Sequence, residues 1–208
     1  MILIGQYDSP FVRRVGIAMR LYGIPFEHKP WSTFGDADKI RPFSPVTRVP
    51  VLVLDDGDAL IESHKILDYL DSLVPAAKRL FPAEEPQRRR ALKVAALACN
   101  VADKAVALFY EEKLHSEVSE LFASRCRSQI EATLAALEES RAAAGGPYWF
   151  GEALGHADIV AATMLRHLAE AHPGLAPMHR YPALAAHSAR MEAMPVFQEI
   201  SQVFIPPA

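Results

Sequence analysis

The sequence has little cysteine and no residues spaced to hold a metal ion or a catalytic disulfide. Two of its 208 residues are cysteine, Cys99 and Cys126, and they form no CxxC motif. A framework of several disulfides is therefore excluded. Two free, buried thiols in a reducing compartment are expected, which favours the cytoplasm. The eight histidines include no HxxxH or HxH pair, so we expect no metal site.

The sequence also lacks an excess of charge of either sign and any long uninterrupted apolar run. Its net charge is −3 and half of its residues are hydrophobic, which gives no reason to expect nucleic acid or an anionic membrane as a partner. Four polar residues interrupt the most apolar long segment, 92–110, so no membrane span is expected. Residues 1–7 lack the basic start and apolar stretch of a signal peptide, and we expect none.

Residues 1–74 alternate strand and helix signals. Strands are predicted over 2–7, 25–31, 51–54 and 59–61, helices over 10–22 and 63–74, and a short helix or loop over 36–41. The order βαβαββα predicts a small α/β domain, in which a right-handed βαβ crossover is followed by a hairpin.

A linker and an all-helical region are predicted to follow. Residues 75–86 contain three prolines and no sustained period, which is typical of an interdomain linker. Beyond them the strand signal disappears, and helices are predicted over 87–113, 117–144, 156–171 and 181–194. The chain is thus predicted to contain an α/β domain over 1–74, a linker over 75–86 and a helical domain over 87–208.

The stretch SPFVRRV, which begins at Ser9, carries a helix-initiation signal. A serine hydroxyl caps a helix by accepting a hydrogen bond from a backbone N–H of the first turn. Proline suits the first helical position, as Pro10 does here. Arg13 and Arg14 are expected on a solvated face of this helix, and an approach of one of them to the ligand or to the domain interface is the alternative. The pattern leaves open whether the Ser9 hydroxyl also does chemistry.

Two further stretches, TRVPVL and IESHKILDYL, lie where predicted strands begin or end. Pro50 is compatible with the start of a strand, and most X–Pro bonds are trans, so the Val49–Pro50 bond is expected to be trans on this ground alone. Glu62 and Ser63 lie where a strand meets a helix. Ser63 is expected to cap that helix with its N–H and hydroxyl facing outward, which makes a corner suited to a carboxylate. A plain cap with an acidic neighbour is the alternative.

Together these stretches resemble the cytosolic glutathione transferase family over essentially the whole chain. SPFVRRVGIAMRLYGIPFE is similar to the first βαβ unit of its serine-dependent classes, especially tau-like and related bacterial members. VTRVPVL and IESHKILDYLD are similar to the two glutathione-binding segments, and GEALGHADI to the N-terminal box of the core helix in the second domain. The chain departs from the family pattern at Gly155, where Ser or Thr is usual, and at Thr47, where Gly is frequent.

The resemblance implies a thioredoxin-like first domain with a cis Val49–Pro50 bond, and glutathione as co-substrate without a metal. It implies that the Val49 backbone pairs with the cysteinyl part of glutathione and that Glu62 and Ser63 hold the γ-glutamyl end. Arg48 stands where a polar residue of the family reaches the glycyl carboxylate, and a guanidinium suits that partner. An exposed, solvating Arg48 is the alternative.

The resemblance also implies that Ser9 is the catalytic residue. A thiol with a pKa of about 8.5 is mostly protonated at neutral pH, and the thiolate is the nucleophile. A hydroxyl that donates to the sulfur at a helix N-terminus lowers that pKa. Tyr7 is the alternative hydroxyl, since other classes use a tyrosine at the end of the first strand. Members that reduce disulfides carry Cys in place of Ser9, and residues 1–98 contain none, so that chemistry is not expected.

The predicted function is therefore the conjugation of glutathione to a small electrophile by a homodimer. A glutathione-binding regulatory or scaffold protein of the same fold, without significant turnover, is the alternative. Isomerisation or dehalogenation with glutathione as a cofactor is a weaker alternative. Residues of the first long helix are candidates for the electrophile site, although plain helix core would give the same pattern. They are Asn100, Asp103, Phe109 and Tyr110.

Overall fold

The strands form one mixed sheet. The computed structural model of the chain describes residues 1–206. Its strands are β1 (Ile2–Ile4), β2 (Glu27–Lys29), β3 (Val51–Val53) and β4 (Ala59–Ile61). They lie in the order β2-β1-β3-β4, with β2 parallel to β1 and β3 antiparallel to both of its neighbours. This is the thioredoxin-like α/β domain that the resemblance implied.

Helix α1 (Pro10–Tyr22) has the bounds that the sequence predicts, because both of its ends carry local signals. Ser9 is the N-cap, and its Oγ accepts a hydrogen bond from the Val12 amide at 3.4 Å. Gly23 ends the helix in the left-handed conformation, with φ of 68°. The capping hydrogen bond to the Val12 amide thus positions the Ser9 side chain at the start of α1.

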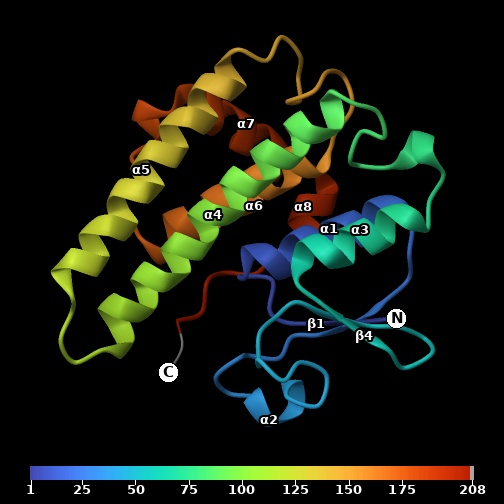
Figure 1. Cartoon of the computed structure of the whole chain (residues 1–208), viewed down its shortest axis with the longest axis horizontal. Helices are drawn as coiled ribbons and strands as arrows, with labels where there is room; N and C mark the ends of the chain where they lie inside the picture. The colour runs from blue at the N-terminus through green and yellow to red at the C-terminus, as the bar shows by residue number, and fades with distance from the viewer. Residues whose placement is uncertain (207–208) are drawn as a thin grey trace.

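Two more helices complete the first domain, α2 (Ala37–Ile40) and α3 (Ser63–Ser72). Helices α1 and α3 lie side by side over the sheet (Figure 1). Between them and the sheet lies a buried apolar cluster made of Leu3, Val12, Val15, Ala18, Met19, Leu52, Ile66, Leu67 and Leu70. This packing places the N-termini of α1 and α3 near the same end of the sheet.

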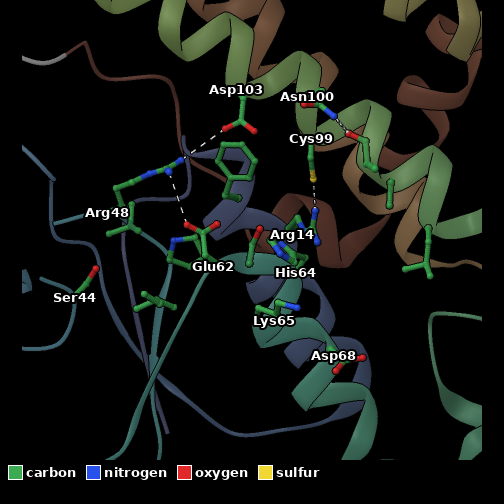
Figure 2. Close-up of a pocket in the computed structure, with 18 of the residues that line it drawn as sticks. Arg14, Ser44, Arg48, Glu62, His64, Lys65, Asp68, Cys99, Asn100 and Asp103 are labelled. Carbon is green, nitrogen blue, oxygen red and sulfur yellow. Dashed lines mark hydrogen bonds and ion pairs between the residues drawn. The ribbon is translucent and has the colours of Figure 1, made fainter. Parts of the chain in front are cut away.

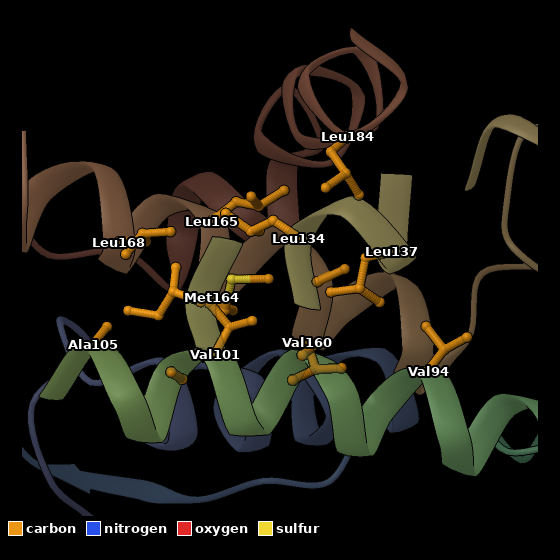
Figure 3. Packing of buried hydrophobic residues seen from close by; sticks show 14 of the residues in the cluster. Val94, Val101, Ala105, Leu134, Leu137, Val160, Met164, Leu165, Leu168 and Leu184 are labelled. Carbon is orange, nitrogen blue, oxygen red and sulfur yellow. The ribbon is translucent and has the colours of Figure 1, made fainter. Parts of the chain in front are cut away.

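The second domain is helical, as predicted. After the short 3-10 turn η1 (Ala76–Lys78) come α4 (Gln87–Leu114), α5 (Glu120–Ala142), α6 (His156–Ala171), the 3-10 turn η2 (Met178–Arg180), α7 (Pro182–Glu192) and α8 (Pro195–Glu199). Helix α6 is buried along most of its length, and apolar side chains of α4, α5 and α7 pack around it (Figure 3). Helix α4 also faces the first domain, where it forms one wall of the candidate site.

Several element bounds differ from those predicted. Strand β1 ends at Ile4 rather than at residue 7, because Gly5 adopts φ of 126° and turns the chain out of the sheet. The predicted helix over 181–194 ends at Glu192, and α8 was not predicted. Met194 is extended (ψ 138°) before Pro195, which starts a new helix.

The glycine that departs from the family pattern, Gly155, lies where the linker approaches the start of α6 closely. A Cβ at this position would lie 2.9 Å from the carbonyl oxygen of Leu80. The next residue, His156, donates its amide to that same oxygen at 3.0 Å. Asp158 still completes the helix start, since its carboxylate accepts from the amides of Gly155 and Trp149 at 2.9 and 2.8 Å. A side chain with a capping hydroxyl at position 155 would therefore require the backbone near Leu80 to shift.

A buried carboxylate, Asp71 of α3, connects both domains. It accepts hydrogen bonds from the Tyr22 hydroxyl, from His156 Nε2 of α6 at 2.9 Å and from the Phe81 amide at 3.3 Å. Burial alone would raise the pKa of Asp71, but the hydrogen bonds from His156 and Tyr22 outweigh it and hold that pKa below its usual value. Asp71 is therefore the acceptor that joins α1, α3, the segment after η1, and α6.

Candidate functional site

A cavity of about 550 Å³ lies between the first domain and helix α4 (Figure 2). Five of the predicted site residues line it, and they come from the β3 and β4 ends of the sheet and from the start of α3. They are Arg48, Val49, Pro50, Glu62 and Ser63. Ser9, the predicted catalytic residue, is not among the residues that line this cavity. The structure thus brings together the predicted binding residues, while Ser9 caps α1 and does not line the cavity.

Sheet pairing brings Val49 and Glu62 together although they are distant in sequence. Val51 of β3 is the register partner of Ile61 of β4, so the residues just before β3 and just after β4 meet at one end of the hairpin. The Val49–Pro50 bond is cis, as the resemblance implied and against the expectation from residue statistics. Gly5 permits the approach from β1, since a Cβ there would lie 2.8 Å from the Cβ of Val49.

The start of α3 differs in detail from the prediction. Glu62, not Ser63, is the N-cap residue, and it makes no side-chain capping bond. Its backbone has φ of 67°, a conformation that is uncommon for a residue with a Cβ and that clusters at functional sites. Ser63 is the first helical residue and is 3% exposed. Because its hydroxyl is not used as the cap, it can serve a ligand at the positive end of the helix.

Arg48 reaches from the first domain toward α4. Its guanidinium lies 3.8 Å from a carboxylate oxygen of Glu62 and 3.7 Å from one of Asp103 (Figure 2). Burial raises the pKa of Asp103, and the nearby Arg48 opposes that shift. Both ion pairs are long and the Arg48 side chain is 61% exposed, so they contribute little to stability. The guanidinium therefore lies beside the cavity and forms no short ion pair with either carboxylate.

The Ser9 hydroxyl can still donate a hydrogen bond even though its oxygen caps α1. Its Oγ acts as the acceptor for the Val12 amide, and a serine hydroxyl that accepts one bond can still donate its own proton. The side chain is partly exposed. Two residues later, Phe11 of the same helix lines the cavity. The chemistry that this position offers is one O–H donor at the positive end of a helix.

Tyr7, the alternative hydroxyl, packs away from the cavity. Its ring stacks on His28 with centroids 3.8 Å apart and planes 10° apart. Burial raises the pKa of its hydroxyl to about 12. Tyr7 does not line the cavity. This position fits a Tyr7 side chain that packs on the sheet better than one whose hydroxyl stabilises a thiolate in the cavity.

The loop before Ser9 is clamped by the second domain and by the C-terminal segment. His167 of α6 donates from Nδ1 to the carbonyl oxygen of Asp8 at 3.1 Å. The Asp8 carboxylate accepts from the Ile205 amide at 3.0 Å, and the Tyr7 amide donates to the side chain of Gln202 at 3.2 Å. Contacts from far along the chain therefore fix the position of the residue next to Ser9.

The clamp at His167 predicts a pH effect on stability. Burial lowers the pKa of His167 to about 4, against 6.5 for an unperturbed histidine. Since the unfolded state then binds the proton more readily, stability is lost as the pH falls from about 6.5 toward about 4. At pH 5 this one group costs about 2 kcal/mol. The fall in the free energy of unfolding between pH 7 and pH 5 should be smaller by that amount in His167→Gln than in the parent chain. Urea titrations at both pH values measure it, and equal falls in the two proteins would contradict the assignment.

The expectation that Arg13 and Arg14 lie on a solvated helix face is wrong, because both are 2% exposed. Arg13 forms a two-pronged ion pair with Glu192, at 2.6 and 2.7 Å, and donates to two backbone carbonyls of the C-terminal segment. Arg14 faces α4, where its guanidinium contacts Cys99 Sγ, and both residues line the cavity. The alternative, that one of the two arginines approaches the ligand or the domain interface, agrees with the position of Arg14. Cys99 was not predicted at the cavity, since the spacing of apolar residues along one helix gives no sign of a contact with another helix.

The four candidates for the electrophile site lie in different surroundings. Asn100 and Asp103 line the cavity. Tyr110 lies further along α4 and packs edge-to-face on Phe34 of the first domain, with ring centroids 5.5 Å apart. Phe109 is 6% exposed and belongs to the packed interior. The structure brings only the first two of these candidates to the same cavity as Glu62 and Ser63.

Neither a metal group nor a membrane helix is found over residues 1–206. In that part of the chain, no three side chains of His, Cys, Asp or Glu gather closely enough to hold a metal ion. None of its helices combines the length and the apolar composition that a membrane crossing requires.

Known proteins match both domains. The family model for the N-terminal domain of glutathione S-transferase matches residues 3–78, and the model for the C-terminal domain matches residues 112–190. The uncharacterized GST-like protein YibF of Escherichia coli K12 is 31% identical over 139 residues, which covers 66% of this chain and 68% of that protein. Glutathione S-transferase U6 of Arabidopsis thaliana is 31% identical over 165 residues, covering 78% of this chain and 69% of that protein.

A solved structure extends the match to the whole fold. The crystal structure of a glutathione S-transferase from Methylobacterium radiotolerans, in complex with glutathione sulfonate, is similar with a TM-score of 0.90. It is 28% identical, and the match covers 100% of this chain and 98% of that one. The mixed four-stranded sheet, the helical second domain and these matches together show that the chain belongs to the glutathione transferase family of enzymes.

Proposed function

We propose that the chain conjugates glutathione to a small electrophile, as a homodimer in the cytoplasm. The observation that carries the proposal is the meeting of Val49, Glu62 and Ser63 around one cavity at the N-terminus of α3. A tripeptide with an ammonium, two carboxylates and a thiol finds a complementary group for each charged end there. The bound glutathione or glutathione sulfonate in similar structures supports this ligand.

The γ-glutamyl end of glutathione is assigned to the β4–α3 corner. Ser63 offers a hydroxyl and a backbone N–H at the positive end of α3, which suits the carboxylate. The Glu62 carboxylate suits the ammonium group. Val49, directly before β3, offers its backbone to the cysteinyl residue. Arg48 is assigned to the glycyl carboxylate, for which it would exchange its long contacts to Glu62 and Asp103.

Ser9 is assigned the role of donor to the glutathione sulfur. Its hydroxyl does not attack the electrophile; it stabilises the thiolate that does, with help from the positive end of α1. The proton that glutathione loses goes to solvent, and the thiolate forms the bond to the electrophile. A leaving group, where the electrophile has one, departs with the electron pair of the bond that breaks.

A glutathione-binding protein without significant turnover is the second candidate. The observation that favours it is the position of Ser9, which does not line the cavity that the binding residues share. The two candidates differ in one measurement. Consumption of glutathione with any member of a broad electrophile panel supports the enzyme, whereas glutathione binding without consumption supports the second candidate.

Removing the groups at the β4–α3 corner is expected to weaken glutathione binding. Ser63→Ala removes a donor to a carboxylate, and we expect a loss of about 1.5–3 kcal/mol in binding free energy. Glu62→Gln should weaken binding through the ammonium group. Calorimetry measures both, with Ser72→Ala at the other end of α3 as the matched control. If Ser63→Ala and Glu62→Gln both bind glutathione as tightly as the parent chain, the β4–α3 corner is not part of the binding site.

The homodimer is expected to be visible as a solution mass of twice the 22.9 kDa of one chain. Two apolar side chains on either side of the linker, Leu73 and Leu92, are 46% and 40% exposed and could form part of a two-fold interface. Light scattering at micromolar concentrations measures the mass. A value near that of one chain would show that the protein is a monomer.

A further inference from the structure

Arg14 is a buried cation that no carboxylate neutralises within residues 1–206. It is 2% exposed, its Nε has no hydrogen-bond partner there, and its Nη1 contacts Cys99 Sγ (Figure 2). The preceding residue, Arg13, is equally buried but is paired with Glu192 through two short contacts. An unpaired buried charge is costly, so buried cations normally have an anionic partner. The one side chain that the Arg14 guanidinium contacts in this part of the chain is the Cys99 thiol, which would become an anionic partner on losing its proton.

Cys99 and Cys126 lie in very different surroundings. Cys126 is 1% exposed, inside the core of the helical domain. Cys99 is partly exposed and lines the cavity that also contains Glu62 and Ser63. The guanidinium of Arg14 is aimed at the same wall of that cavity (Figure 2). The cavity thus combines the Cys99 thiol, the buried Arg14 cation beside it and the β4–α3 corner assigned to glutathione.

We propose that Cys99 is a site of mixed-disulfide formation with glutathione, which the cavity positions for the exchange. The co-reactant is the disulfide of glutathione. The Cys99 thiolate attacks one sulfur of that disulfide, the sulfur–sulfur bond breaks, and a bond forms between Sγ and that sulfur. The other half leaves as a thiolate and takes up the proton that Cys99 has lost. The selectivity of this exchange for glutathione rests on the function proposed above, in which the cavity binds glutathione. The reactivity of the Cys99 thiol itself does not depend on that proposal.

The charges around Cys99 set the pH range of this exchange. Burial holds the pKa of the Cys99 thiol above its usual value. Arg14 of α1 offsets only part of this shift, and the carboxylates of Asp103 and Glu62 oppose Arg14. Since the thiolate is the attacking species, the rate of adduct formation should rise as the pH is increased into the alkaline range. Arg14→Met keeps much of the side-chain volume without the charge. It should slow the reaction at neutral pH by roughly tenfold, which corresponds to one pKa unit.

The test uses the full chain, incubated with glutathione disulfide and followed by intact-mass spectrometry. We expect one glutathionyl adduct on the parent chain and on Cys126→Ser, none on Cys99→Ser, and its removal by dithiothreitol. The adduct should prevent binding of S-methylglutathione, and S-methylglutathione should slow its formation. An adduct on Cys126, or no adduct on the folded parent chain, would overturn the proposal. The rise in rate with pH in the parent chain checks the thiolate step even if Arg14→Met does not fold.

Hydroxyethyl disulfide, which lacks the charged ends of glutathione, separates this inference from the proposed function. We expect it to modify Cys99 at least tenfold more slowly than glutathione disulfide at equal concentration. Equal rates, with no protection by S-methylglutathione, would show that the cavity does not position the disulfide. Calorimetric binding of S-methylglutathione without any adduct would overturn the role of Cys99 and leave the proposed function standing. Absence of that binding would count against the proposed function itself.

Discussion

Replacing Ser9 with alanine should lower the turnover of glutathione with a reactive aryl halide by roughly 10- to 150-fold. The range corresponds to the loss of one hydrogen bond to a charged group, which is about 1.5–3 kcal/mol. The affinity for glutathione should change far less, because the corner at Glu62 and Ser63, with Val49, holds the tripeptide. Initial rates at saturating glutathione, together with calorimetry, separate the two effects.

The cap at Ser9 requires a control. Ser9→Ala also removes the side chain that accepts from the Val12 amide, and loss of a cap costs about 1 kcal/mol of stability. Ser9→Gly removes the same hydroxyl but costs only a few tenths of a kcal/mol as a cap. The two variants should therefore show the same loss of turnover and different stabilities. If turnover instead follows stability, Ser9 acts through the helix and not through the sulfur.

Replacing Asp71 with alanine should lower the free energy of unfolding by about 3–5 kcal/mol. Three donors would lose their acceptor: the Tyr22 hydroxyl, His156 Nε2 and the Phe81 amide. Each buried donor left without a partner costs about 1–3 kcal/mol. Because these donors belong to both domains, we expect the loss to appear in a single unfolding transition of the whole chain.

Asp68 supplies the matched control for that experiment. It lies on the same helix, its side chain is 75% exposed, and its ion pair with Arg88 is long at 3.8 Å. Asp68→Ala should change the free energy of unfolding by less than about 1 kcal/mol. Urea titrations followed by tryptophan fluorescence and by circular dichroism measure both variants. Equal losses in the two, or an Asp71→Ala variant as stable as the parent, would contradict the role assigned to Asp71.

Elements whose limits are set by neighbouring residues could be predicted from the sequence. Helix α1 has a serine cap, a first-turn proline and a terminal glycine, and both of its predicted bounds are confirmed. Strand β1 was predicted too long, because its end depends on how Gly5 fits against Val49, which is far away in the sequence. Local chemistry thus sets both ends of α1, whereas a contact between distant segments sets the end of β1.

In the candidate site too, features carried by a short motif could be predicted from the sequence, whereas contacts between distant segments could not. Two short motifs carry the five residues assigned to glutathione binding, and the structure places all five on one cavity, while their role in binding stays a prediction. The contact between Arg14 and Cys99 was not predicted, since they are 85 residues apart and each lies on a different helix. The residue that caps α3 was also assigned wrongly, because the conformation of Glu62 depends on the hairpin before it.

The pKa of the glutathione thiol in the complex tests the central claim most directly. Thiolate absorbance of the bound tripeptide, followed against pH, should give a pKa clearly below the value of about 8.5 for an ordinary thiol. In Ser9→Ala that pKa should return toward the solution value, and in Tyr7→Phe it should stay low. A bound thiol with its solution pKa in the parent chain, or a low pKa that Tyr7→Phe abolishes and Ser9→Ala does not, would contradict the account.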